Sequence, residues 1–162
     1  MAAGFVCDTS VLFYLGRIRH LHLLPQLFHT ILVPGQVIFE LDVGRSLTPG
    51  VVDPRTLDFI TISAVSQTEI ACMPTNRLGE GERAVIALAR RSHELIAGLD
   101  DRLARQFAIE LGLTVKGTVG LIVDAKQAGL IPVAHNLLEL LRQTGFRLDQ
   151  RLFEVALSLA GE

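Results

Sequence analysis

Acidic residues directly follow apolar segments at two places in the chain. Asp8 follows a short apolar run, and the pair Asp100-Asp101 follows another that ends at Leu99. Clustered carboxylates repel one another, so they coexist at neutral pH only with protons or a cation among them. Oxygen ligands favour hard cations such as Mg²⁺ or Mn²⁺, which polarise phosphoryl oxygens and lower the pKa of a water molecule. The pattern therefore favours metal-assisted hydrolysis of a phosphodiester.

Each of these acids also has a purely structural explanation. Asp8 precedes an expected helix and can cap it, although Thr9 or Ser10 can do so equally well. Asp100 and Asp101 can both cap the helix that follows them. One cap is enough, however, and an adjacent acid pair costs repulsion.

Other charged residues are weaker candidates on spacing alone. Glu40 lies in a helical segment and on periodicity alone is typical of a surface acid. Glu82 begins a helix, where an acid also stabilises the helix dipole; Glu80 competes with it but faces another direction. Asp124 is typical of a solvated acid, and Arg105 fits either an ion pair within its helix or a phosphate contact. The five histidines show no metal-ligand spacing.

The strands and helices that position these acids follow from the apolar pattern and from the glycines and prolines. Strands are expected at residues 4–7, 30–33, 59–62, 94–99 and 113–115. Helices are expected at residues 11–18, 21–28 with a break or bend at Pro25, 36–43, 82–91, 102–111, 118–127, 132–143 and 150–159. Residues 44–58 and 63–79 are expected to be irregular. Buried strands that alternate with helices predict an α/β fold with a parallel sheet covered on both faces.

That fold brings the strand-end acids together. In open α/β sheets, functional sites form beyond the carboxyl ends of the strands, so Asp8 and the Asp100-Asp101 pair are expected to converge on one crevice. Gly117-Thr118 also follows a strand and offers a hydroxyl and helix N-terminal amides at the same edge.

Composition limits the classes of protein to which the chain can belong. Its 162 residues fit one domain, and a hydrophobic content of 49% with mean hydropathy +0.42 suggests a covered sheet and an oligomer interface. A formal net charge of -2 does not by itself point to nucleic acid, so an RNA partner must be argued from the site and from local patches such as Arg90-Arg91. Two cysteines without ligand spacing, no signal peptide and no membrane-spanning run predict a cytoplasmic protein with reduced thiols.

Five segments resemble, in order, the motifs of one protein family. They are FVCDTSVL at residues 5–12, VPGQVIFEL at 33–41, LGEGERAVIALA at 78–89, LDDRLAR at 99–105, and VKGTVG at 115–120 with the following Ala125-Lys126. The family is the PIN domains, and the fourth and fifth segments resemble its VapC-like branch of toxin ribonucleases. The likeness covers the chain from about residue 4 to residue 150.

The resemblance implies more than the acids do alone. It implies a three-layer α/β/α sandwich with a central, mostly parallel sheet of about five strands, formed by residues 1–162 as one nuclease domain. It implies one or two Mg²⁺ or Mn²⁺ ions and single-stranded RNA as substrate. It also implies a homodimer and, as in toxin–antitoxin pairs, a partner antitoxin protein, with no membrane attachment.

The resemblance also assigns roles to residues. The metal ligands are Asp8, Glu82 in preference to Glu80, and Asp100 or Asp101. Asp100 stands at the strand end, whereas Asp101 holds the metal through water or orients Arg105. By this resemblance, Glu40 binds a second metal or orients the attacking water. Thr9, Ser10 and Thr118 form hydrogen bonds to water or phosphate. Arg102 and Arg105 position the substrate.

Three other functions compete with this interpretation. A non-catalytic PIN-like module that binds RNA or protein is favoured by the low basic and high apolar content. An aspartyl phosphatase needs a second aspartate two residues after the first, where this chain has Ser10. A dinucleotide loop at Gly79 and Gly81 is opposed by two glutamates that would repel a pyrophosphate.

Overall fold

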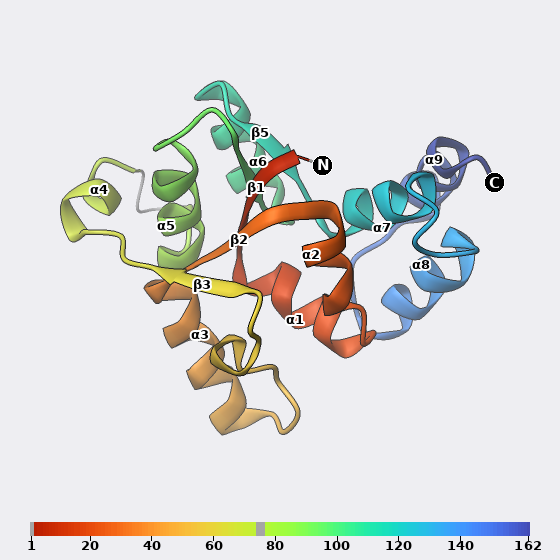
Figure 1. The fold of residues 1–162 in the computed structure, drawn as a ribbon, viewed down its shortest axis with the longest axis horizontal. Coiled ribbons are helices and arrows are strands. Elements are labelled where there is room, and N and C mark those ends of the chain that lie inside the picture. Colours follow the sequence, from red (N-terminus) through yellow and green to blue (C-terminus); the bar gives the residue numbers. More distant parts are fainter. Residues whose placement is uncertain (1, 74–76) are drawn as a thin grey trace.

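A single parallel sheet connects the two halves of the chain (Figure 1). The computed structural model of the protein describes residues 2–73 and 77–162, and within them five strands lie in the order β3-β2-β1-β4-β5. The strands are β1 (Ala2–Cys7), β2 (Phe28–Pro34), β3 (Ile60–Ser63), β4 (Leu95–Gly98) and β5 (Thr114–Lys116). Every neighbouring pair is parallel, which confirms the predicted sheet.

The strand order reverses between β1 and β4. From β1 the chain moves outward to β2 and β3, whereas from β4 it moves to β5 on the other side. Cys7 pairs with Gly98 in the register, so the carboxyl ends of the two central strands lie side by side. Ligand sites of open α/β sheets lie at such a reversal. Asp8 and Asp100 stand just beyond it.

Helices cover both faces of the sheet. They are α1 (Thr9–Arg17), α2 (Leu24–Leu27), α3 (Gly35–Leu47), α4 (Gln67–Ala71), α5 (Glu80–Ala89), α6 (Arg102–Glu110), α7 (Thr118–Gln127), α8 (Ala134–Gln143) and α9 (Gln150–Ala160), with the 3-10 turns η1 (Leu21–Leu23) and η2 (Pro54–Thr56). Helices α2 and α3 contact β2, and α5 contacts β1, β2 and β4. Right-handed crossovers place these two sets of helices on opposite faces of the sheet, where they form the outer layers. The predicted three-layer α/β/α sandwich is therefore confirmed.

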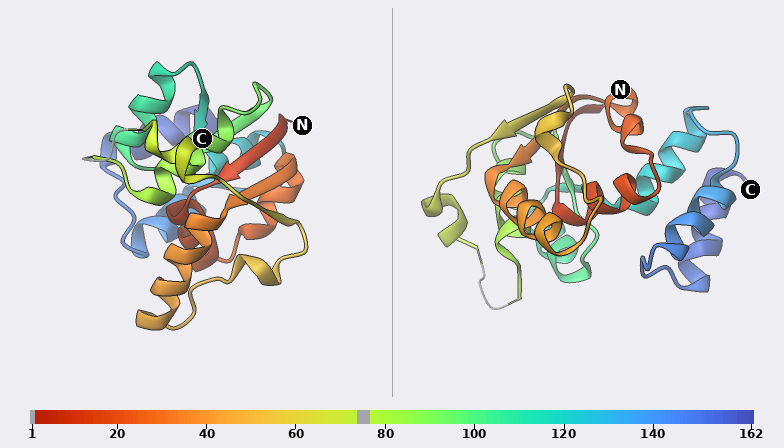
Figure 2. Two further views of the ribbon diagram at one scale, coloured as in Figure 1. Left: turned by 90° about the vertical axis from the view of Figure 1, so that its left-hand side faces the viewer. Right: turned by 90° about the horizontal axis from the view of Figure 1, so that it is seen from below.

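The last three helices form a group of their own. Helix α7 contacts both α8 and α9, and the right-hand view of Figure 2 shows α8 and α9 set to one side of the molecule, beyond α7. No helix within residues 2–73 and 77–162 combines the length and apolar character needed to cross a membrane.

The central strand is buried on both sides. Phe5, Val6 and Cys7 have no exposed surface, and the Phe5 ring stacks on Phe28 with centroids 4.6 Å apart. Continuous apolar runs are typical of parallel strands covered on both faces, which is why β1 could be recognised in the sequence.

The segments that were expected to be irregular contain more helix than predicted. Helix α3 continues past Gly44 to Leu47, where the ion pair between Asp42 and Arg45 and a 2.9 Å hydrogen bond from Arg45 to the Val52 carbonyl stabilise its last turn. These contacts offset the cost of about 1 kcal/mol for a glycine inside a helix.

A second helix was also missed. Helix α4 begins at a capping box in which Ser66 accepts from the Glu69 amide at 3.2 Å and Glu69 accepts from the Ser66 amide at 2.9 Å. The S-x-x-E spacing is visible in the sequence. Residues 74–76 of the same predicted loop lie outside the described residues. Pro25, expected to place a break or bend in the segment 21–28, stands in the first turn of α2, directly after the 3-10 turn η1 ends at Leu23, and its missing amide costs nothing there.

Gly98 is expected to be essential for the stability of the sheet. A Cβ atom at this position would lie 2.4 Å from the Phe5 ring and 2.7 Å from the Val6 carbonyl oxygen, and neither neighbour can move freely in the buried sheet. Gly98→Ala is therefore expected to lower the free energy of unfolding by about 3 kcal/mol, the upper part of the range for overpacking. Urea unfolding measures the change. Gly35→Ala is the matched control because its Cβ meets nothing within 4 Å; an equal loss in both variants would contradict the argument.

Candidate functional site

Asp8 is a buried carboxylate at the end of the central strand. Its side chain is 4% exposed, and its Oδ1 atom has no hydrogen-bond partner among the residues that the structure describes. Asp8 occupies the N-cap position of α1 but makes no side-chain cap bond there. The capping explanation of this residue is therefore not supported by its contacts.

The surroundings of Asp8 disfavour its negative charge. Burial raises the pKa of this carboxyl well above its ordinary value, and the carboxylates of Glu82, Glu40 and Asp100 raise it further, opposed by the Thr9 backbone amide. A buried oxygen without a partner beside other acids is a position where a cation relieves both desolvation and repulsion.

Glu82 and Glu80 diverge within the first turn of α5. Glu82 is half-buried and accepts from the Gly79 amide at 2.9 Å. Burial raises the pKa of Glu82, as do the nearby Asp101 and Glu40, while the bond from Gly79 lowers it. Glu80 is exposed and does not line the cavity that Glu82 shares with Asp8.

Glu40 reaches the same place from α3 through a close approach to α5. Its Oε1 accepts from the Gly81 amide at 2.9 Å, and Thr9 Oγ1 donates to its Oε2. A Cβ at Gly81 would lie 2.6 Å from that Oε2, so a side chain here would displace the Glu40 carboxylate from its present position. Gly81 is a positioning residue that sequence reasoning missed, although it stands between the two glutamates of the GEGE segment.

The adjacent aspartates have separate tasks. Asp100 Oδ1 accepts from the Thr118 amide at 2.7 Å, and Oδ2 accepts from Thr118 Oγ1 at 2.7 Å and Ser10 Oγ at 3.1 Å. These three bonds leave about one of the four lone-pair sites of the carboxylate free. Asp101 Oδ2 accepts from the Ala104 amide at 2.9 Å and caps α6.

All five predicted acids line one cavity of about 410 Å³. Its lining comprises Asp8, Thr9, Ser10, Phe13, Tyr14, Glu40, Gly79, Glu82, Asp100 and Asp101. The acids come from β1, α3, α5 and the end of β4, and they meet at the reversal of the strand order. The cavity concentrates negative charge around Asp8.

Thr9 and Ser10 also line this cavity, whereas Thr118, Arg105 and Arg102 lie around it. Thr118 is fully buried, and its hydroxyl donates a hydrogen bond to Asp100 Oδ2. Arg105 donates to the Leu99 carbonyl at 2.8 Å and lines a neighbouring cavity, while Arg102 is exposed at the start of α6 and lines neither.

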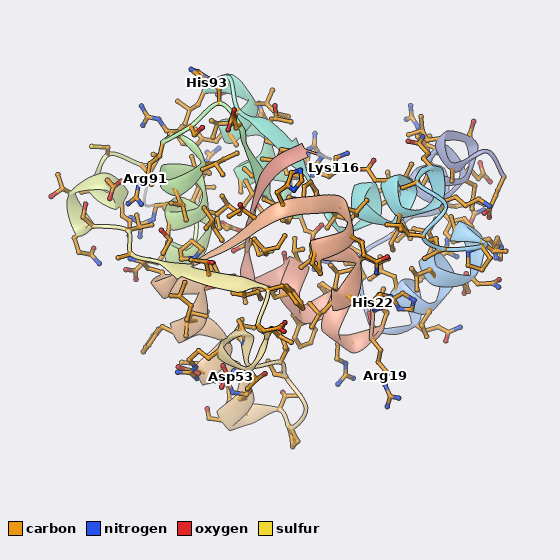
Figure 3. The ribbon with its side chains drawn as sticks, viewed as in Figure 1. Arg19, His22, Asp53, Arg91, His93 and Lys116 are labelled. Carbon is orange, nitrogen blue, oxygen red and sulfur yellow. The ribbon has the colours of Figure 1, made fainter. Side chains whose placement is uncertain are left out.

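The Arg90-Arg91 patch lies at the far end of α5 from Glu82. Arg91 sits beside α4 (Figure 3) and pairs with Glu69 at 2.9 Å. This bond, together with hydrogen bonds from the Ser66 amide and hydroxyl, lowers the pKa of Glu69 to about 2. The patch is therefore tied to α4 and does not extend the acidic cavity.

The donor set of the cavity fits a hard divalent cation. Every candidate ligand is a carboxylate oxygen, and one of these oxygens is buried without a partner. Within residues 2–73 and 77–162, no group of three or more His, Cys, Asp or Glu side chains is placed closely enough to hold a metal ion.

Comparison with known proteins adds one match. A family model described as a PIN domain matches residues 4–162. No curated protein matches the chain.

Proposed function

The chain belongs to the PIN-domain family, whose members are generally nucleases that depend on divalent metal ions, and we propose that it is an endoribonuclease acting on single-stranded RNA. The observation that carries the proposal is the buried Oδ1 of Asp8, which has no hydrogen-bond partner among the described residues and lies at the strand reversal in one cavity with four other acids. We assign residues 1–162 to one nuclease domain of the VapC-like branch, acting in the cytoplasm as the toxin of a toxin–antitoxin pair.

Asp8, Glu82 and Asp100 would hold Mg²⁺ or Mn²⁺. Thr118 and Ser10 fix the rotamer of Asp100, and Gly79 fixes that of Glu82. Hydrogen bonds of this kind orient the ligand carboxylates before the metal binds. A bound divalent ion supplies charge neutralisation at a phosphoryl oxygen and lowers the pKa of a water molecule.

Glu40 and Thr9 complete the assignment. Their mutual hydrogen bond holds the Glu40 carboxylate at the rim, where it can accept a proton from an incoming water or hold a second ion. Asp101 caps α6 and so fixes the backbone that carries Asp100. Arg102 and Arg105 would contact phosphates of the RNA on either side of the acidic cavity.

Cleavage of single-stranded RNA in Mn²⁺ tests the proposal, and the chain offers a matched pair of variants. Glu82→Gln removes a carboxylate from the cavity, so the rate is expected to fall by about 100-fold or more because several kcal/mol of charge stabilisation are lost. Glu80→Gln changes an exposed residue of the same helical turn, and its rate is expected to stay within about threefold of wild type. EDTA should stop the reaction, and excess Mn²⁺ should restore it.

Equal rates for the two glutamine variants would remove Glu82 from the site. Cleavage that persists in EDTA would contradict a metal-dependent reaction. If the wild type binds RNA but does not cleave it, the second candidate is favoured, a non-catalytic module that binds RNA or protein. The net charge of -2 and the high apolar content also support this candidate.

A homodimer and a partner antitoxin also remain proposals. Support comes from α3, where Phe39, Val43 and Leu47 repeat every four residues and are 69%, 45% and 79% exposed. An apolar stripe of this kind on one helix face suits a protein contact. Sedimentation of the purified chain measures whether a second copy covers it.

A further inference from the structure

A second, larger cavity adjoins the acidic one. It measures about 540 Å³, lies among β5, α7 and α9, and falls within the roughly 300–1,000 Å³ typical of small-ligand pockets. Asp100 lines both cavities, so the second begins where the acidic site ends. Of the site residues assigned above, Asp100 and Arg105 reach this space, and the rest of its lining has no role so far.

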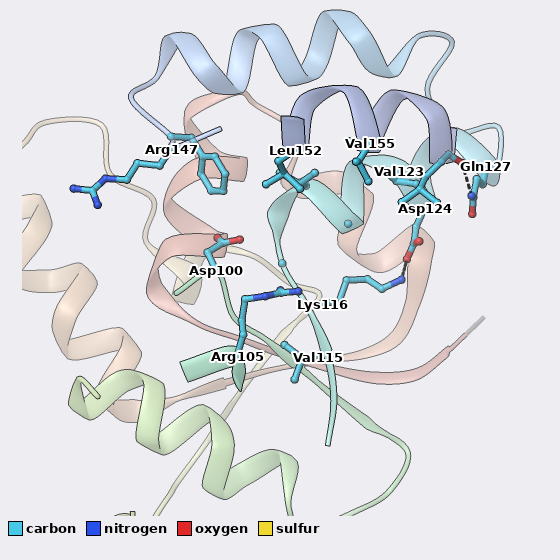
Figure 4. Close-up of a pocket in the computed structure, with 16 residues that line it drawn as sticks. Asp100, Arg105, Val115, Lys116, Val123, Asp124, Gln127, Arg147, Leu152 and Val155 are labelled. Atoms are coloured by element: carbon cyan, nitrogen blue, oxygen red, sulfur yellow. Dashed lines mark hydrogen bonds and ion pairs between the residues drawn. The ribbon is translucent and has the colours of Figure 1, made fainter. Parts of the chain in front are cut away.

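One wall of the second cavity is apolar and exposed. Leu152 and Val155 of α9 are 42% and 47% exposed, and Val123 of α7 lies near them. Figure 4 shows Leu152 and Val155 facing Asp100 and Arg105 across the cavity. Large exposed apolar side chains that line a hollow are typical of a surface that receives a ligand.

The opposite side and the rim carry Arg105, Lys116 and Arg147 together with the acids Asp100 and Asp124. Lys116 pairs with Asp124, so its charge is compensated. Arg105 makes a hydrogen bond to the Leu99 carbonyl, and Arg147 points outward at the rim (Figure 4); within the described parts of the chain neither arginine forms an ion pair. Two guanidinium groups beside an apolar wall complement a ligand that has a flat apolar part and an anionic part.

A row of aromatic rings joins the two cavities. The Phe13 and Tyr14 rings are edge to face at 5.0 Å, and the Tyr14 and Phe146 rings are edge to face at 4.8 Å. Phe13 and Tyr14 line the acidic cavity, whereas Phe146 lines the second. Proteins that bind single-stranded nucleic acid combine such rings with a cationic track along the backbone.

We propose that the second cavity is a subsite for one unpaired nucleotide of the RNA, adjacent to the phosphate at the acidic site. The base lies against Leu152, Val155 and Phe146, and its phosphate meets Arg105 or Arg147. This inference rests on the proposed function and deepens it, because it makes the enzyme selective for single strands: a base held in a duplex is not free to enter the pocket. Size, charge and the aromatic link to the acidic cavity favour a nucleotide over a peptide.

Binding measured without cleavage tests the subsite. Fluorescence anisotropy of a labelled ten-nucleotide single strand with the full chain in EDTA gives the affinity. Val155→Glu places a negative charge on the apolar wall and is expected to weaken binding by about tenfold or more, the scale of losing one stacked base. Leu140→Glu is the matched control: it is 41% exposed on α8, lines neither cavity, and is expected to stay within about twofold of wild type.

A charge reversal at the rim gives an independent measurement. Arg147→Glu is expected to weaken binding and to reduce the slope of log affinity against log salt by about one, because one phosphate contact is lost. Arg151 is exposed on the first turn of α9 and lies outside the cavity, so Arg151→Glu is expected to leave that slope unchanged. A duplex of the same sequence is expected to bind less tightly than the single strand.

The outcomes separate this inference from the proposed nuclease. Weaker binding in Val155→Glu but not in Leu140→Glu supports the subsite even if the wild type cleaves nothing. Equal affinities for these two variants, or no RNA binding at all, would overturn the subsite, even where Mn²⁺-dependent cleavage is intact. Conversion of an oligomer to a monomer by Val155→Glu, with RNA affinity unchanged, would assign the wall to a second copy of the chain and also overturn it.

Discussion

Asp8→Asn is expected to stabilise the metal-free protein while it removes RNA cleavage. The asparagine keeps the shape of the side chain but carries no charge into the buried site, where Oδ1 has no partner within the described residues. Cleavage in Mn²⁺ is expected to fall by about 1,000-fold or more, since a ligand of the catalytic ion is lost. The free energy of unfolding in EDTA is expected to rise by at least about 1 kcal/mol, or roughly 2–4 °C in Tm for a chain of this size.

The stability difference depends on pH in a defined direction. Burial, together with the neighbouring acids, raises the folded-state pKa of Asp8 above its unfolded value. The native state therefore binds the proton more tightly, and the stability that this provides is complete below the unfolded pKa and is lost as pH rises through the folded pKa. Thermal melts of both proteins in EDTA should coincide most closely at acid pH and diverge toward neutral pH, with the wild type falling below the variant.

Metal should reverse this order. An ion that binds the folded wild type at 100 times its dissociation constant adds about 2.7 kcal/mol, and Asp8→Asn is expected to lose most of that gain. Asp149→Asn is the matched control because Asp149 is also an N-cap, accepts from the Leu152 amide at 2.8 Å, and caps as well when it is an asparagine. If Asp8→Asn cleaves RNA like Asp149→Asn, Asp8 has no part in the reaction.

The second large effect is expected at Asp100, and it separates this residue from its neighbour. Asp100→Asn places an amide group against the donors Thr118 and Ser10, which occupy about three of the four lone-pair sites of the carboxylate. Cleavage is expected to fall by about 1,000-fold, and the fold to lose about 1–3 kcal/mol from unmatched donors. Asp101→Asn keeps its oxygen for the Ala104 amide, so the cap survives and cleavage is expected to stay within about tenfold.

Single-turnover cleavage and urea unfolding of the two variants measure these effects together. A greater loss of cleavage in Asp101→Asn than in Asp100→Asn would assign the metal to Asp101 and leave Asp100 a structural role. Thr118→Val provides a further check: it removes one donor to Asp100 without touching the cavity, and it should weaken Mn²⁺ binding by about 10- to 100-fold.

The general position of the acids could be inferred from the sequence, but their contacts could not. Asp8 and Asp100 follow buried strands, and the rule that parallel strands end at one edge places them together before any coordinates are known. Whether Asp100 or Asp101 caps α6 depends on the backbone angles at the end of β4, which spacing does not determine. The close approach of Glu40 to Gly81 depends on how α3 packs on α5, a contact between segments 41 residues apart.

The fold was predictable wherever one strong local signal decided the structure. The apolar run of β1 and the Asp149 cap of α9 are such signals. Helix α3 passed through Gly44 because ion pairs and a contact with Val52 outweigh the preference of glycine for other conformations. Helix α4 is short, and its capping box at Ser66 carries more information than the composition of its loop.

The central position of β1 has a consequence for the newly synthesised chain. Its partner on one side, β2, leaves the ribosome soon after it, but its partner on the other side, β4, is made about ninety residues later. Until then the nascent protein has an uncovered apolar strand edge, which is prone to aggregation. Asp100 follows β4, so a nascent chain that has not yet reached the end of β4 lacks Asp100 and Asp101 from the acid set.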